Sequence, residues 1–194
     1  MSGTPIGSMT DRLLAAMRGA AARSYGGESV TELAHALQCG DLARAGGAEE
    51  ELQLACLLHD VGRYAVDPTL VADKKDRDPT DPRPGARGHG EVGAGLIAPW
   101  VPARVAWCVR MHAEAKRYLC AVESAYHDGL SPASKRTLVM QGGVMTRDEA
   151  ARFAAQPWAQ DAVALRRWDD QAKVIGKTTS SLEEWEPLLR RYFG

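Results

Sequence analysis

Four histidines and two aspartates lie on or beside apolar helical faces in this 194-residue sequence: His35, His59, Asp60, His89, His112 and Asp169. An unpaired imidazole or carboxylate is poorly tolerated in an apolar core, so each of these groups needs a partner. Four such histidines on four predicted helices are hard to satisfy unless they converge. Imidazole and carboxylate ligands without thiolates suit iron, manganese or zinc at a hydrolytic or oxygen-activating centre. The set therefore predicts a metal site.

The adjacent His59-Asp60 pair lies near the end of residues 51–63, ELQLACLLHDVGR. Leu52, Cys56 and His59 fall at helical spacing, which predicts an apolar helix whose buried stripe ends in the pair. An isolated His-Asp doublet is more often a helix-end histidine with a capping aspartate. The other histidines of the sequence are what favour a metal site here. Six ligands are too many for one ion that keeps an open position. One carboxylate bridging two ions resolves the count and predicts a dinuclear site.

Hydrophobic spacing and capping patterns predict an all-α protein, a compact bundle of seven to nine helices in one domain of residues 1–194. Residues 1–8 are expected to be disordered, and residues 67–88 to form a long surface loop. Capping boxes are expected at residues 29–32, 146–149 and 181–184. Helices are expected over residues 10–23, 29–46, 51–60, 89–98, 102–126, 131–142, 146–156, 158–175 and 181–193.

Composition excludes several classes of protein. The net charge of −1 gives no electrostatic footprint for nucleic acid. No apolar run approaches the roughly 18 residues of a membrane span, and the N-terminal residues lack the pattern of a signal peptide. The four cysteines are widely spaced and predict reduced core thiols in a cytoplasmic protein. His127, beside an aspartate and a glycine, is expected to be solvated.

The order of the six residues, H…HD…H…H…D, resembles the HD-domain superfamily, which is best known for metal-dependent phosphohydrolases. More specifically, the chain resembles the mixed-valent diiron oxygenases that cleave organophosphonates and are related to myo-inositol oxygenase. The resemblance covers residues 25–173. It is carried by the stretches YGGESVTELAHALQ, LLHDVG, GHGEVGA, LSPASKRTLVMQGG and RRWDDQAK.

The resemblance implies two iron ions in a mixed-valent Fe(II)/Fe(III) pair. His35, His59, Asp60 and Asp169 would hold the first iron, and His89, His112 and the bridging Asp60 would hold the second. Asp170 competes with Asp169 for the first site. Asp169 is preferred because it keeps the four-residue spacing to Lys173 that the related inositol oxygenases show.

Five further residues take roles by the same resemblance. Tyr25 and Glu28 are similar to a mobile lid pair, in which the tyrosine covers the first iron until substrate arrives and the paired glycines between them act as a hinge. Lys116 and Ser134 are similar to groups that bind the phosphonate, as a cation and a hydroxyl donor suit a dianion. Arg63 replaces a histidine common in the branch, and it would attract an anion of a different shape.

The implied reaction is the oxidation of a small 1-hydroxy-(2-amino-type)alkylphosphonate by dioxygen to a carboxylic acid and phosphate. Three alternatives stay open. They are an HD phosphohydrolase acting on a small phosphate ester, an oxygenase acting on a polyol, and a regulatory module that binds an anion without turnover. The Tyr25–Glu28 pair favours an oxygenase, because a water-activating site has no use for a tyrosine that covers the metal.

Overall fold

The computed structural model describes residues 8–26, 28–64 and 88–194, which hold ten α-helices, one 3-10 turn and no strand. The all-α prediction is confirmed. The predicted loop at residues 67–88 lies outside the described residues except for Gly88, which begins a helix. The elements are α1 (Met9–Ala20), α2 (Glu32–Ala45), α3 (Glu50–Leu58), η1 (Val61–Arg63), α4 (Gly88–Ile97), α5 (Ala103–Val122), α6 (Tyr126–Gly129), α7 (Pro132–Met140), α8 (Arg147–Ala154), α9 (Ala159–Gln171) and α10 (Leu182–Phe193).

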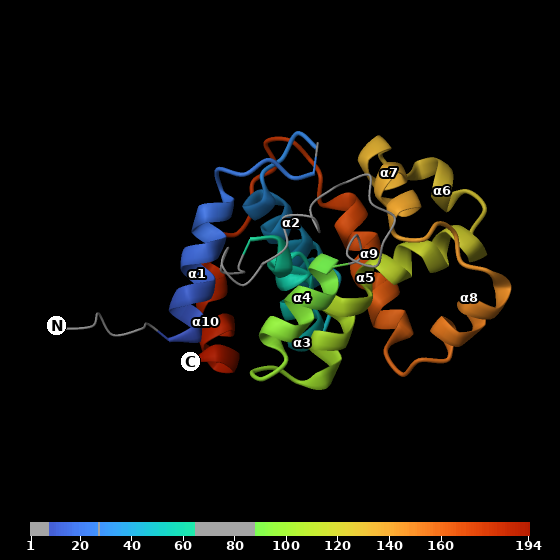
Figure 1. Cartoon of the computed structure of the whole chain (residues 1–194). Coiled ribbons are helices and arrows are strands. Elements are labelled where there is room, and N and C mark those ends of the chain that lie inside the picture. Colours follow the sequence, from blue (N-terminus) through green and yellow to red (C-terminus); the bar gives the residue numbers. More distant parts are fainter. Residues whose placement is uncertain (1–7, 27, 65–87) are drawn as a thin grey trace.

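Helices α2, α3, α5 and α9 form the centre of the bundle, and α4 packs on α5 beside them (Figure 1). Helices α1 and α10 lie side by side at one end, and α8 lies at the other end. The apolar stripe of α3 is fully buried, with Leu54, Leu57 and Leu58 inaccessible to solvent. A second apolar cluster around Leu119 and Phe153 joins α5 to α8 and α9. None of the described helices is both long enough and apolar enough to cross a membrane.

The predicted helix starts are mostly confirmed, with two corrections. Ser131 caps α7, and capping boxes open α8 and α10. The box expected at residues 29–32 is wrong, because Thr31 alone caps α2 while the Glu32 side chain turns toward Arg23 and Arg63. Ser8, which the sequence predicts to be disordered, is the N-cap of α1, and residues 1–7 lie outside the described residues.

Helix α1 ends about three residues, and helices α5 and α9 about four residues, before their predicted ends, and side-chain contacts explain the end of α9. Helix α9 ends at Gln171 rather than near residue 175. The Gln38 side chain donates to the Val174 carbonyl and accepts from the Val174 N–H, so this backbone pairs with α2 instead of continuing the helix. The Ala172 carbonyl accepts a hydrogen bond from His35 instead of closing another helical turn. Helix α5 ends at Val122, and residues 126–129 form the separate short helix α6.

Gly62 lets η1 approach α4 closely, which brings two parts of the histidine cluster together. A Cβ added to Gly62 would lie 2.1 Å from the His89 carbonyl oxygen and 2.6 Å from the Gly93 nitrogen. Both atoms belong to the α4 backbone, so relief requires the helix itself to shift.

Replacing Gly62 by alanine should therefore destabilise the protein by roughly 1–3 kcal/mol, the usual cost of overpacking. Thermal unfolding of the two proteins measures the difference. Gly95→Ala on α4 is the matched control, because a Cβ there meets nothing within 4 Å. The added methyl should be neutral or slightly stabilising at that helical position. Equal melting temperatures for Gly62→Ala and wild type would contradict the close packing of η1 on α4.

Candidate metal centre

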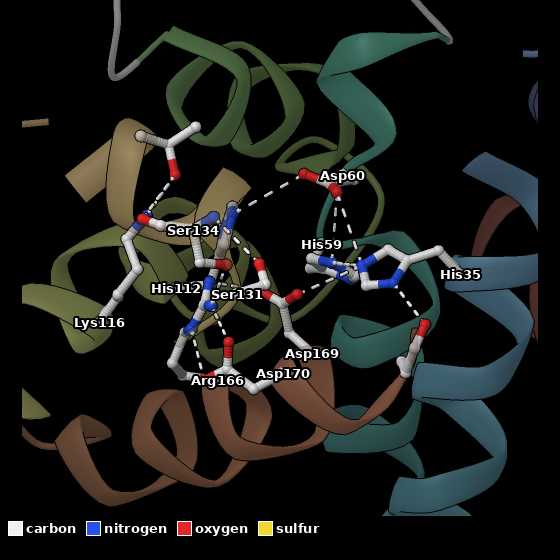
Figure 2. A network of polar contacts seen from close by, with 12 residues as sticks. His35, His59, Asp60, His112, Lys116, Ser131, Ser134, Arg166, Asp169 and Asp170 are labelled. Carbon is white, nitrogen blue, oxygen red and sulfur yellow. Dashed lines mark hydrogen bonds and ion pairs between the residues drawn. The ribbon is translucent and has the colours of Figure 1, made fainter. Parts of the chain in front are cut away.

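The structure brings the six predicted ligands together at the centre of the bundle. Figure 2 labels all of them except His89. His35 comes from α2, His89 from α4 and His112 from α5. His59 is the C-cap of α3, and Asp60 follows it at the start of η1. Asp169 lies on α9, so five helices and one turn supply the centre. The residues form two groups that could each hold a metal ion, one of His35, His59 and Asp169 and the other of Asp60, His89 and His112.

Three side chains form the first group, and all are inaccessible or nearly so. The Nε2 atoms of His35 and His59 are 3.1 Å apart, and His35 Nε2 is 3.3 Å from Asp169 Oδ1. Ligands of one ion, each about 2.1 Å from it, lie about 3 Å apart at adjacent positions. The spacing of the first group therefore matches a shared metal ion.

The second group has the same spacing and shares Asp60 with the first. The Nε2 atoms of His89 and His112 are 3.0 Å apart, and Asp60 Oδ1 is 3.1 Å from His89 Nε2. The other oxygen, Asp60 Oδ2, faces the first group at 3.4 Å from His59 Nε2 and 3.8 Å from His35 Nε2. One carboxylate thus presents one oxygen to each group, which is the arrangement of a bridging ligand.

The orientation of three histidines shows that the first group fits a cation. His35, His59 and His112 each place Nδ1 within 2.7–2.8 Å of a backbone carbonyl. A carbonyl only accepts hydrogen bonds, so each Nδ1 carries a proton and each Nε2, the nitrogen that a metal ion would bind, faces inward. The Nε2 atoms of His35 and His59 are 3.1 Å apart, and without an ion the Asp60 carboxylate outweighs burial and raises the pKa of His59 well above its usual value, which favours a proton between the two nitrogens. A metal ion would replace that proton, and the carbonyls orient the rings as metal-ligating histidines require.

The carboxylates support the same conclusion. Asp60 Oδ2 and Asp169 Oδ1 are buried, and neither has a hydrogen-bond partner. Burial favours the neutral acid of Asp169, yet the Arg166 guanidinium holds the pKa of that carboxyl well below its usual range. Burial lowers the pKa of His112 to about 3, so this imidazole stays neutral. Charged carboxylates and a neutral imidazole are the protonation states that metal ligation needs.

The geometry also separates Asp169 from Asp170. Asp169 Oδ2 accepts a hydrogen bond of 2.6 Å from Arg166 Nη1, which leaves Oδ1 directed at His35. Asp170 instead binds Arg166 and the Tyr126 hydroxyl and belongs to neither group.

Tyr25 covers the first group. Its ring stacks on the His35 imidazole with centroids 3.8 Å apart and an angle of 18° between the planes. Enclosure of the phenol raises its pKa well above the usual value, and the Asp169 and Asp60 carboxylates raise it further. Glu28 accepts a hydrogen bond of 2.6 Å from the Ser131 hydroxyl. Gly26 has a positive φ of 49°, whereas its predicted partner in the hinge, Gly27, lies outside the described residues.

Beside the first group lies a cluster of buried polar side chains. Lys116, which is 2% exposed, donates 2.7 Å to the Thr137 hydroxyl and lies 3.4 Å from the Ser134 carbonyl. Burial, together with the nearby positive charge of Arg166, lowers the pKa of Lys116 to about 7. The Ser134 hydroxyl accepts from Lys173 at 3.0 Å and from Arg166 at 3.5 Å. Amines, a guanidinium and hydroxyls converge here, which suits a small dianion.

Sequence reasoning missed Arg166 and Thr137. Arg166 precedes Asp169 by three residues, a spacing that any surface ion pair on a helix can share. Arg166 is only 4% exposed, and a buried guanidinium needs several partners, so its contact with Asp169 is not an ordinary surface ion pair. Arg63 forms an ion pair with Glu32. His127 is half exposed, as predicted. All four cysteines are free.

Comparison with known proteins supports the geometry. The pattern of the HD-domain family matches residues 32–141. The chain is 41% identical to the hydroxymethylphosphonate dioxygenase of Gimesia maris over 84% of this chain and 78% of the relative. It is 34% identical to the glycine-betaine-forming [1-hydroxy-2-(trimethylamino)ethyl]phosphonate dioxygenase of Leisingera caerulea, over 86% of this chain and 81% of that protein. The chain therefore belongs to the HD-domain family, in the branch that contains these phosphonate dioxygenases.

Proposed function

We propose that this protein is a dioxygen-dependent diiron oxygenase that cleaves the C–P bond of a small 1-hydroxyalkylphosphonate. The products are a carboxylic acid and phosphate, and together they contain both oxygen atoms of one O2. The observation that carries the proposal is a pair of ligand groups sharing Asp60, with a tyrosine stacked over the more buried group. Both relatives named above are, by name, dioxygenases of 1-hydroxyphosphonates.

In this proposal each of the six side chains is a metal ligand. His35, His59 and Asp169 would hold one iron, His89 and His112 would hold the other, and Asp60 would be shared by both. A mixed-valent iron pair would supply the redox chemistry with dioxygen. The backbone carbonyls beside the three Nδ1 atoms fix the imidazoles, and Arg166 keeps Asp169 charged and correctly turned.

The cluster around Lys116 would bind the phosphonate. The ammonium and the Arg166 guanidinium offset the charge of the dianion, and the Ser134 and Thr137 hydroxyls donate to its oxygens. Arg166 contacts both Asp169 and Ser134, so it links this anion site to the first metal group. Such fixed contacts hold the carbon that bears the hydroxyl next to the irons, and positioning of this kind contributes much of an enzyme's rate.

The test separates oxidation from hydrolysis. Protein loaded with Fe(II) and then oxidised by one electron per iron pair with limiting oxygen should show, once the oxygen is removed, a mixed-valent Fe(II)/Fe(III) signal that changes when hydroxymethylphosphonate is added. On admission of oxygen, it should consume one O2 for each phosphate released. A phosphohydrolase would instead release phosphate from small phosphate esters without oxygen. One tightly bound zinc, no second ion and no oxygen uptake would refute the proposal.

Removing the Tyr25 hydroxyl tests the role of the lid. If the phenol covers the first iron before substrate binds, Tyr25→Phe should let oxygen reach Fe(II) without substrate, and the mixed-valent state should decay faster in air. The measurement is the decay of the mixed-valent signal under oxygen, with iron content matched. Tyr192→Phe on the remote helix α10 is the control. Equal decay rates for the Tyr25 variant and wild type would show that Tyr25 does not guard the metal.

A further inference from the structure

Arg63 lies against the tyrosine that covers the first ligand group. It ends η1, the turn that follows His59 and Asp60. Its Cζ atom is 5.1 Å from the centroid of the Tyr25 ring, within the range of a cation–π contact. A Cβ added to Gly26 would lie 3.6 Å from the Arg63 Nη2 atom, so the guanidinium also follows the backbone beside the tyrosine.

A buried carboxylate fixes the guanidinium in that place. Glu32 is 5% exposed, and its Oε1 accepts a hydrogen bond of 3.2 Å from Arg63 Nε. Its Oε2 lies 3.1 Å from Arg23 Nε, and Arg23 in turn donates to the Arg63 carbonyl at 3.3 Å. A carboxylate this buried is retained only when it is paired. Glu32 therefore ties Arg63 to the two ends of the segment that carries Tyr25.

The backbone of that segment is also tied at its base. The Tyr25 N–H donates to the Val30 carbonyl at 3.0 Å, and the Glu32 N–H donates to the Arg23 carbonyl at 2.9 Å. These two bonds fix the backbone at the ends of the segment, residues 23–25 and 30–32, but they do not touch the Tyr25 side chain. The position of the tyrosine ring depends on what the ring touches, and it stacks on His35 with Arg63 beside it.

We propose that Arg63 is a positioning residue for Tyr25. Held by Glu32, its guanidinium keeps the phenol ring against His35, and so sets how readily the tyrosine leaves the first metal group. The inference rests on the proposed function only in taking Tyr25 as the group that covers this metal. In this arrangement Arg63 affects substrate binding through Tyr25 rather than by touching the phosphonate.

Amide hydrogen exchange tests the proposal without any turnover. In the metal-loaded protein without substrate, Arg63→Gln should speed exchange at the Tyr25 and Glu28 amides roughly three- to tenfold, the factor expected for losing a contact of this class. Arg104→Gln is the matched control, because Arg104 is similarly exposed (24% against 28%) and pairs with Asp161 in another part of the bundle. This control should leave both amides unchanged. Unchanged exchange in Arg63→Gln would overturn the proposal.

A double-mutant cycle distinguishes positioning of the ring from a purely structural ion pair. In a Tyr25→Leu background, Arg63→Gln should add nothing to the exchange at Glu28. The same acceleration in both backgrounds would mean that Arg63 acts through Glu32 alone, which overturns the proposal. If Arg63→Gln fails to fold, Arg63→Lys carries the same comparison, because it keeps the charge beside Glu32 but lacks the planar guanidinium. Exchange that follows the proposal in a protein with no oxygenase activity would sink the proposed function and leave the positioning role standing.

Discussion

Replacing Asp60 by asparagine should strip both metal ions from the protein and abolish oxygen uptake. Each Asp60 oxygen faces a different ligand group, at 3.1 Å from His89 Nε2 and 3.4 Å from His59 Nε2. The amide keeps the shape but loses the charge, and its NH2 group can face only as a donor. Loss of one outer-shell partner of a metal ligand alone costs roughly 10–100-fold in metal affinity. Loss of a shared ligand should cost each site at least that much.

Metal analysis of the purified variants measures this effect, with His35→Ala and Asp169→Asn for comparison. Those two changes touch only the first group, so each should leave about one ion per chain, held by His89, His112 and Asp60. Asp161→Asn, on α9 but at the remote Arg104 ion pair, is the control and should keep both ions. An Asp60→Asn protein that retains one full equivalent of metal would show that Asp60 serves a single site.

Replacing Lys116 by methionine should weaken substrate binding while making the protein more stable. The variant lacks the charge-assisted bond from the ammonium to the phosphonate, which is worth about 1.5–3 kcal/mol. The apparent dissociation constant of the substrate should therefore rise by roughly 10–150-fold. Without substrate the buried ammonium destabilises the folded protein, because burial lowers the pKa of Lys116 to about 7 from an ordinary value near 10.5. Methionine has a similar shape and carries no charge to bury.

The difference in free energy of unfolding between Lys116→Met and wild type should depend on pH. Below pH 7 Lys116 is charged in both folded and unfolded protein, so folding must bury the full charge and the variant has its largest advantage. Above pH 10.5 the amine is neutral in both states and the advantage disappears. The difference in free energy of unfolding between the two proteins should therefore shrink as the pH rises from 7 to above 10. Lys135→Met on the exposed face of α7 is the control and should change neither binding nor stability. Loss of iron from Lys116→Met would mark the lysine as structural.

The sequence was enough to predict the helical class and the composition of the candidate metal centre. Histidines on apolar stripes leave few ways to satisfy their nitrogens, so the six residues could be grouped before any coordinates. Capping patterns located most helix starts, because an N-cap acts on neighbours two or three residues away. The helix starts depend on local interactions. The metal centre could be predicted because all six side chains need the same kind of partner.

The remaining features depend on contacts between distant parts of the chain. Nothing near Arg166 indicates that its guanidinium is buried against Ser134, 32 residues away. The early end of α9 follows from Gln38, which lies 136 residues before the Val174 backbone it binds. The pairing of Glu32 with two arginines displaced a predicted capping box for the same reason. Local propensity is overridden wherever a buried polar group finds a better partner elsewhere in the fold.

The unequal burial of the two ligand groups has a kinetic consequence. The side chains of His35, His59 and Asp169 are at most 2% exposed, whereas His89 in the second group is 21% exposed. An ion in the second group can exchange with bulk solution through the His89 side, while an ion in the first group is enclosed by protein and Tyr25. The two ions should therefore leave on separate timescales during chelation. Partial extraction would trap a one-ion protein in which Asp60 has become a terminal ligand of the inner ion.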